Sequence, residues 1–132
     1  MSLLARFGGK ASGNDAVMFA IAIIPVVGAV GAAIDYARIN GVRAKLADAL
    51  VAGVAAIGNQ PKMTEAQAFA TVRNVLNARM GPDDAQIWRL NSVTEDGQGH
   101  ITAVASGSVD TAIGRIIGLD RVPVSVRSEA FR

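Results

Sequence analysis

Residues 16–34 form an uninterrupted run of nineteen residues without a charged side chain. As an α-helix the run would be about 28 Å long, close to the ~30 Å thickness of the hydrocarbon core of a bilayer. An isolated segment in lipid has to be helical, because only a helix satisfies its own backbone hydrogen bonds there. We therefore predict a transmembrane helix. Its principal residues are Ala16, Phe19, Ile23, Pro25, Val27, Gly28, Gly31 and Ile34.

Three other interpretations of this run remain open. The first is a buried helix in a soluble core, although a helix of a small domain normally has a polar face. The second is a cleaved signal peptide, with Arg6 and Lys10 as its basic region and small residues 31–33 near the cut. The apolar core of such peptides is usually about 7–15 residues long, which is shorter than this run. The third is a transit peptide, against which the unbroken apolarity argues.

The helix is expected to continue beyond the apolar run. After residue 34 the sequence becomes polar, while apolar residues recur at intervals of three and four, as in an amphipathic helix. We predict one helix from about residue 14 to residue 57, about 65 Å long, ended by the turn residues 58–61. Pro25 lacks an N–H group and is expected to kink or loosen it. The amphipathic stripe consists of Ile39, Val42, Leu46, Leu50, Val54 and Ile57.

Parts of this helix are candidates for packing against other subunits. Small residues in the apolar half would let a second helix approach closely in lipid. The amphipathic stripe could bind a neighbour too, or pack on the chain's own C-terminal domain, and both can hold along different stretches. The candidate subunit-packing residues are Gly28, Gly31, Ile39, Val42, Leu46 and Leu50.

The C-terminal part predicts helices and strands in alternation. Thr64 and Gln67 form a capping box that starts a helix over residues 65–80, and Gly81 and Pro82 end it. Strands are expected at 86–94 and 101–109, joined by a turn at 95–99, followed by a short helix at 111–119 and a last strand at 121–127. In the first strand, strict alternation sets one group of residues against another, namely Ile87, Arg89, Asn91 and Val93 against Trp88, Leu90 and Ser92.

These elements predict the α+β class, with a three-stranded antiparallel sheet covered by helices. At 132 residues the chain has room for a single domain of this kind. We expect three parts: a basic leader at 1–13, a transmembrane and amphipathic stalk helix at 14–58, and a small α+β domain at 61–132.

The composition offers no candidate for catalysis or cofactor binding. The chain has no cysteine, which excludes disulfides and thiolate metal sites. His100 is the one histidine, so a histidine-based catalytic triad cannot be assembled in the conventional way. The acidic pairs Asp83–Asp84 and Glu95–Asp96 fall in expected turns, where acidic residues are common. Trp88 is expected to pack in the core or at an edge. We predict no catalytic, cofactor-binding or metal-binding residues and no small-molecule substrate.

The charge pattern gives no support for nucleic-acid binding. The formal net charge is only +2, and the thirteen lysine and arginine residues are spread along the chain. Nucleic-acid-binding domains normally gather basic residues on one face.

The N-terminal region resembles a known family. Residues 13–20 (GNDAVMFA) precede the apolar run with its central Pro25, and Asp35, Tyr36 and Arg38 follow it, leading into an alanine-rich helix. This arrangement is similar to that of the bacterial Tad (Flp-type) pilus-assembly proteins of the TadE/TadG-like group. The resemblance is closest over residues 13–57, and the strand, short helix and strand of 101–130 are compatible with it.

The resemblance carries expectations about processing. Pseudopilins usually have a glycine before the prepilin peptidase cut and a glutamate five residues after it. Here Gly13 could supply the glycine and Asn14 would begin the processed chain, but Met18 occupies the glutamate position. Larger relatives also carry an adhesion-type domain with a metal-binding Asp-x-Ser-x-Ser loop, which this sequence lacks, so the resemblance implies a short form.

The resemblance implies a non-enzymatic structural subunit of a Tad-type pilus or its assembly complex, similar to a minor pilin or pseudopilin. Its expected partners are the lipid bilayer and other pilin-like or pilus-assembly subunits, and it could form a homo-oligomer. We expect it in the bacterial inner membrane, with the C-terminal domain periplasmic or extracellular. Basic residues flank both ends of the apolar run, so charge alone does not fix this orientation. Two alternatives are an extracytoplasmic binding module with a cleaved signal peptide and the repeating subunit of a helical filament.

Overall fold

The computed structural model describes residues 12–82 and 86–132. The expected basic leader up to residue 11, including Arg6 and Lys10, and the acidic pair Asp83–Asp84 lie outside the described residues. The elements, in chain order, are helix α2 (Ser12–Gly58), helix α3 (Glu65–Met80), strand β1 (Gln86–Glu95), strand β2 (His100–Asp110), the 3₁₀-helix η1 (Gly114–Ile117) and strand β3 (Arg121–Phe131). This confirms the predicted α+β class, with a long N-terminal helix, a three-stranded antiparallel sheet and a second helix.

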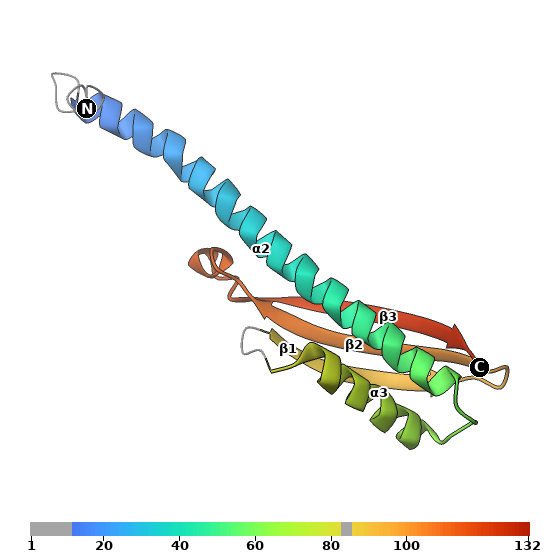
Figure 1. The fold of residues 1–132 in the computed structure, drawn as a ribbon. Coiled ribbons are helices and arrows are strands. Elements are labelled where there is room, and N and C mark those ends of the chain that lie inside the picture. Colours follow the sequence, from blue (N-terminus) through green and yellow to red (C-terminus); the bar gives the residue numbers. More distant parts are fainter. Residues whose placement is uncertain (1–11, 83–85) are drawn as a thin grey trace.

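Helix α2 has two halves with different surroundings. Its N-terminal half projects away from the rest of the molecule, whereas its C-terminal half lies across the sheet (Figure 1). Pro25 lies inside the helix, which is continuous from Ser12 to Gly58. One proline removes a single backbone hydrogen bond, so the turns on either side still hold the helix together.

The core lies between the C-terminal half of α2, helix α3 and one face of the sheet. Leu46, Leu50, Val54 and Ile57 of the predicted stripe are almost completely buried, and Ile39 and Val42 are partly buried against the same core. Along this stretch the stripe therefore packs on the chain's own domain. Other core side chains come from α3 and the strands: Val72, Leu76, Met80, Leu90, Val93, Ile101, Ala103, Ala105, Val109, Val124 and Val126.

Helix α3 begins at the predicted capping box. The Thr64 Oγ1 accepts a hydrogen bond from the Gln67 N–H (3.2 Å), and the Gln67 Oε1 accepts one from the Thr64 N–H (3.1 Å). The two side chains thus satisfy donors that have no partner inside the helix. This reciprocal pair confirms the predicted start of the helix.

The predicted hairpin is present, but strict alternation in the first strand is wrong. The pairing of β1 with β2 shifts between Leu90 and Ser92, which leaves Asn91 as an extra residue in a β-bulge. Leu90 and Val93, predicted on opposite faces, are therefore both buried, opposite Ala105 and Ala103 of β2.

The connection between β2 and β3 also differs from the prediction. Instead of a helix over 111–119, only the short 3₁₀-helix η1 forms. The N–H groups of residues 112–114 donate to the carboxylate of Asp35 on α2, and Gly118 ends the turn with a φ of 89°. The left-handed Gly118 ends the helical segment directly after Ile117, which leaves too few residues for an α-helix. Strand β3 continues to Phe131, beyond the predicted end at 127.

The buried stripe of α2 predicts a matched difference in stability. Replacing Leu50, which is fully buried, by alanine should lower the free energy of unfolding by about 2–5 kcal/mol, because it removes core contacts and leaves a cavity. The control Val51→Ala changes an exposed residue one position away and should stay within about 0.5 kcal/mol of the parent. Denaturant unfolding in detergent, followed by Trp88 fluorescence, measures both. Equal losses would contradict the packing described here.

Candidate functional site: the exposed half of α2 and the loop beside it

The N-terminal half of α2 is an exposed apolar surface. In the stretch 13–34, all of which the structure describes, every residue except Gly31 is exposed. Helix α2 is long and apolar enough to cross a membrane. The rest of the chain leaves its apolar stretch almost uncovered, unlike the core helix of a soluble protein. The buried-helix interpretation is therefore wrong. The large exposed side chains are Val17, Met18, Phe19, Ile21, Ile23, Ile24, Val26, Val27, Val30 and Ile34.

Asp35 follows this surface directly and is held inside the molecule. Only 7% of the residue is exposed, and its carboxylate accepts three backbone hydrogen bonds from the loop after β2. The Ala112 N–H donates to Oδ1 at 2.6 Å, while the N–H groups of Ile113 and Gly114 donate to Oδ2 at 3.1 and 2.9 Å. One carboxylate thus fixes the position of the loop against α2.

The same hydrogen bonds favour the charged form of Asp35. The bond from the Ala112 N–H contributes most to lowering the pKa of the Asp35 carboxyl below its ordinary value of 3.8, followed by that from Gly114. Burial acts in the opposite direction, while the Ile113 N–H and the positive charge of Arg38 lower the pKa further. Asp35 therefore remains an anion at neutral pH.

Arg38 makes a second link between α2 and the same loop. Its Nη1 donates to the carbonyl oxygen of Asp110 at 3.2 Å, one helical turn after Asp35. Two residues of the pattern that follows the apolar run, Asp35 and Arg38, thus bind the end of β2 and the loop after it. Tyr36, between them, is exposed.

An apolar groove of about 700 Å³ lies between α2 and this loop. Ile113, which lines the groove, packs against Gly31 of α2, where an added Cβ would overlap its side chain. On the loop side, Ile116, Ile117 and Leu119 are 76%, 77% and 54% exposed. Ile116 and Ile117 are the most exposed large aliphatic side chains of the described chain, and the loop adjoins the exposed half of α2.

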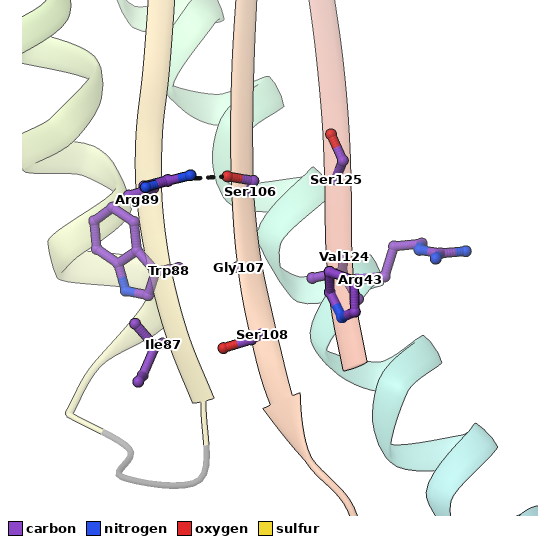
Figure 2. Close-up of a pocket in the computed structure, with 10 residues that line it drawn as sticks. Arg43, Ile87, Trp88, Arg89, Ser106, Gly107, Ser108, Val124 and Ser125 are labelled. Carbon is purple, nitrogen blue, oxygen red and sulfur yellow. Dashed lines mark hydrogen bonds between the residues drawn. The ribbon is translucent and has the colours of Figure 1, made fainter. Parts of the chain in front are cut away.

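A second hollow, of about 660 Å³, lies on the sheet (Figure 2). Its residues come mainly from the three strands, with Arg89 donating from Nε to the Ser106 Oγ at 3.4 Å. Trp88 lines it and is also partly buried against the core. This region presents hydroxyl groups and two guanidinium groups, those of Arg43 and Arg89, without a buried ionisable group.

His100 is the first residue of β2, and its acidic neighbours are Asp96 in the turn between β1 and β2 and Glu129 in β3. The His100 ring stacks on Phe131 with centroids 4.8 Å apart, and its Nε2 lies 3.4 Å from Glu129 Oε2. The Asp96 carboxylate accepts the N–H groups of His100 and Gln98, and these bonds lower the pKa of Asp96. Residues 12–82 and 86–132 contain no group of three or more His, Cys, Asp or Glu side chains placed to hold a metal ion.

The structure distributes the predicted packing residues over different surroundings. Gly28 is exposed, with open space around it, whereas Gly31 is covered by the loop. Leu46 and Leu50 are buried in the chain's own core, as described above, so they are not available to another subunit in this conformation. Subunit packing through Gly28 stays a prediction. The residues of the possible cleavage site, Gly13, Asn14 and Met18, are exposed in the first turns of α2.

The contact between Asp35 and the loop did not follow from the sequence. The partners are 77 to 79 positions apart, and neither has a motif that indicates the other. A carboxylate directly after an apolar run was the one available indication, because such a group needs compensating partners near lipid.

The contact at Gly31 predicts different effects for two glycine substitutions on the same helix. Gly31→Leu should displace the loop, because filling a closed contact typically costs about 1–3 kcal/mol. Gly28→Leu adds the same side chain in open space and should leave the loop in place. Trypsin cleavage after Arg115, measured in detergent, should become several-fold faster in Gly31→Leu only. Equal cleavage rates in the two variants would contradict the contact.

The Asp35 contact also predicts a pH dependence. Because the pKa is lowered in the docked loop, the carboxylate's contribution is complete above pH 3.8 and is lost as the pH falls through the lowered value. The amide proton resonances of Ala112 and Gly114, followed by NMR in micelles, should titrate with a midpoint below 3.8. Asp35→Asn should abolish this titration, and the exposed control Asp48→Asn should keep it. A midpoint at or above 3.8 in the parent protein would refute the assignment.

Comparisons with known proteins gave one match, to a protein-family model. No curated protein and no solved structure matches the chain. Among protein families, residues 13–58 match the model described as putative Flp pilus-assembly TadE/G-like. This segment is nearly the whole of α2, including the exposed half, Asp35, Arg38 and the buried stripe. The helix that presents the exposed apolar surface therefore matches the TadE/G-like Flp pilus-assembly family, the group that the sequence resemblance indicated.

Proposed function

We propose that this protein is a non-enzymatic structural subunit of a Tad-type pilus or of its assembly complex, anchored in the membrane by the N-terminal half of α2. One observation carries the proposal: the helix that matches the pilus-assembly family has an exposed, uncharged half long enough to cross a bilayer. A structural role in a pilus-related assembly fits this combination.

The apolar half requires an apolar environment. Exposure of apolar surface to water costs about 25 cal/mol for each Å², and residues 13–34 are covered within the chain at Gly31 alone. Lipid satisfies this requirement before assembly, and the helices of neighbouring subunits could replace lipid afterwards. The open space around Gly28 would let such a helix approach closely.

In this proposal the protein resembles a minor pilin or pseudopilin. The short N-terminal end of the chain stays in the cytoplasm, α2 crosses the inner membrane, and the sheet with α3 lies in the periplasm or outside the cell. The C-terminal half of α2 belongs to the folded domain, so one continuous helix joins the proposed anchor to the domain (Figure 1).

The contacts around residues 31–38 favour a retained helix over a cleaved signal peptide. A cut near residue 33 would remove Gly31, which packs against Ile113, and would place a new amino group beside Asp35. Both changes would disturb the docking of the loop. The helix also runs through this position without a break.

A matched pair of substitutions tests the anchor. Val27 and Val51 are 55% and 56% exposed on the same helix, but only Val27 lies in the proposed span. A lysine near the centre of a membrane-spanning helix costs about 2.5–3.5 kcal/mol. Val27→Lys should therefore shift the protein out of the carbonate-washed membrane fraction, whereas Val51→Lys should remain in it.

Mass spectrometry of the membrane-bound parent protein completes the experiment. A mature N-terminus at or before Asn14 supports the retained anchor, and a start at Asn14 in particular supports pilin-like processing. A mature chain that begins near Ile34, or equal membrane retention of the two lysine variants, would overturn the proposal.

A further inference from the structure

The loop between β2 and β3 presents an unusual surface for a strand connection. Its side chains Ile116, Ile117 and Leu119 are all more than half exposed, and Ile113 touches Gly31 of α2. Figure 1 shows the loop beside α2, where the projecting half of the helix meets the half that packs on the sheet. The loop thus lies at the level of the last turns of the apolar run.

Most backbone N–H groups of this loop have hydrogen-bond partners in the loop itself or on α2. Asp35 accepts the N–H groups of residues 112–114, and loop carbonyl oxygens accept those of Ile116, Gly118 and Leu119. The Thr111 N–H donates to the Asp120 carbonyl (3.0 Å), and the Thr111 hydroxyl donates to the Leu119 carbonyl. Unpaired backbone groups are costly next to hydrocarbon, so these partners lower the cost of placing the loop at the edge of the acyl-chain region.

The surface beside the loop is almost purely apolar. The groove between the loop and α2 extends from Ile23 and Val27 on the helix to Ile117 on the loop. Asp35 is the one charged residue among its lining residues, and both of its oxygens are occupied by the loop. The apolar surface of the loop is therefore continuous with the surface of α2 that the proposed anchor places in lipid.

The loop also carries charged side chains. Arg115 lies between the apolar side chains in the sequence and is exposed, Asp120 at the end of the loop is exposed too, and Arg121 follows the loop and pairs with Asp110 at 2.9 Å. A long basic side chain beside an apolar surface can extend to the lipid phosphate groups while its aliphatic part stays in the apolar layer.

We propose that residues 111–120 insert into the membrane interface next to α2, with Ile116, Ile117 and Leu119 in the acyl-chain boundary of the adjacent leaflet. The partner is a phospholipid bilayer, and the argument for it is continuity with the lipid-facing surface of α2. This inference rests on the proposed membrane anchor. Its consequence is a C-terminal domain held at a fixed distance and tilt from the membrane surface, because helix and loop enter the same leaflet side by side.

Because the chain contains no cysteine, single cysteines can be labelled without background. Ile117→Cys tests the loop, Val26→Cys tests the anchor, and Gln98→Cys, in the exposed turn between β1 and β2, is the control outside the membrane. Each full-length variant carries an environment-sensitive fluorophore and is reconstituted into phosphatidylcholine–phosphatidylglycerol vesicles. Some vesicles contain lipids with a nitroxide quencher at a shallow or a deep acyl position. Trp88 emission checks that each variant folds.

The proposal predicts a blue-shifted emission at position 117 with stronger quenching by shallow than by deep nitroxides. At position 26 quenching should be stronger with deep nitroxides, and at position 98 it should be absent. Quenching at 26 without quenching at 117 would overturn the inserted loop and leave the anchor intact. Absence of quenching at 26 would contradict the anchor itself. A blue shift at 117 without lipid quenching, together with energy transfer between labelled copies, would assign this surface to a second copy and also overturn the proposal.

Discussion

The surroundings of helix α2 change along its length, from an uncovered apolar half to a half that packs in the core of the folded domain. Up to residue 34, α2 has an apolar surface that the chain leaves mostly uncovered, whereas from Leu46 onwards one stripe of its apolar side chains is buried in the core. Asp35 and Arg38 lie between these regions and bind the loop after β2. The change of environment therefore coincides with the point at which the folded domain attaches to the helix.

The proposed anchor and the folded domain are joined by one continuous helix. The loop after β2 packs against α2, and the Asp35 carboxylate joins residues far apart in the chain. A flexible linker at this point would let the domain rotate freely, whereas a continuous helix with a docked loop restricts its orientation. In the proposed pilus-related assembly, such a connection would fix which surface of the domain faces neighbouring subunits.

The sequence was sufficient for features that depend on local patterns. The apolar run, the spacing of Leu46, Leu50 and Val54, and the capping box at Thr64 predicted the helices, because helical periodicity and cap chemistry are local properties. The bulge at Asn91 could not be predicted in this way, since it depends on the register with another strand. The conformation of residues 111–120 also escaped prediction, because it depends on a carboxylate from a distant helix that accepts the N–H groups of residues 112–114.

Hydrogen–deuterium exchange of the intact chain in lipid nanodiscs tests the central claim most directly. If the N-terminal half of α2 is buried in lipid, the amides of residues 16–34 will be strongly protected although no other part of the described chain covers most of them. Amides 112–114 will be protected with them. If residues 16–34 instead exchange as fast as an exposed helix while residues 46–57 remain protected, the apolar half is not in the membrane and the account is wrong.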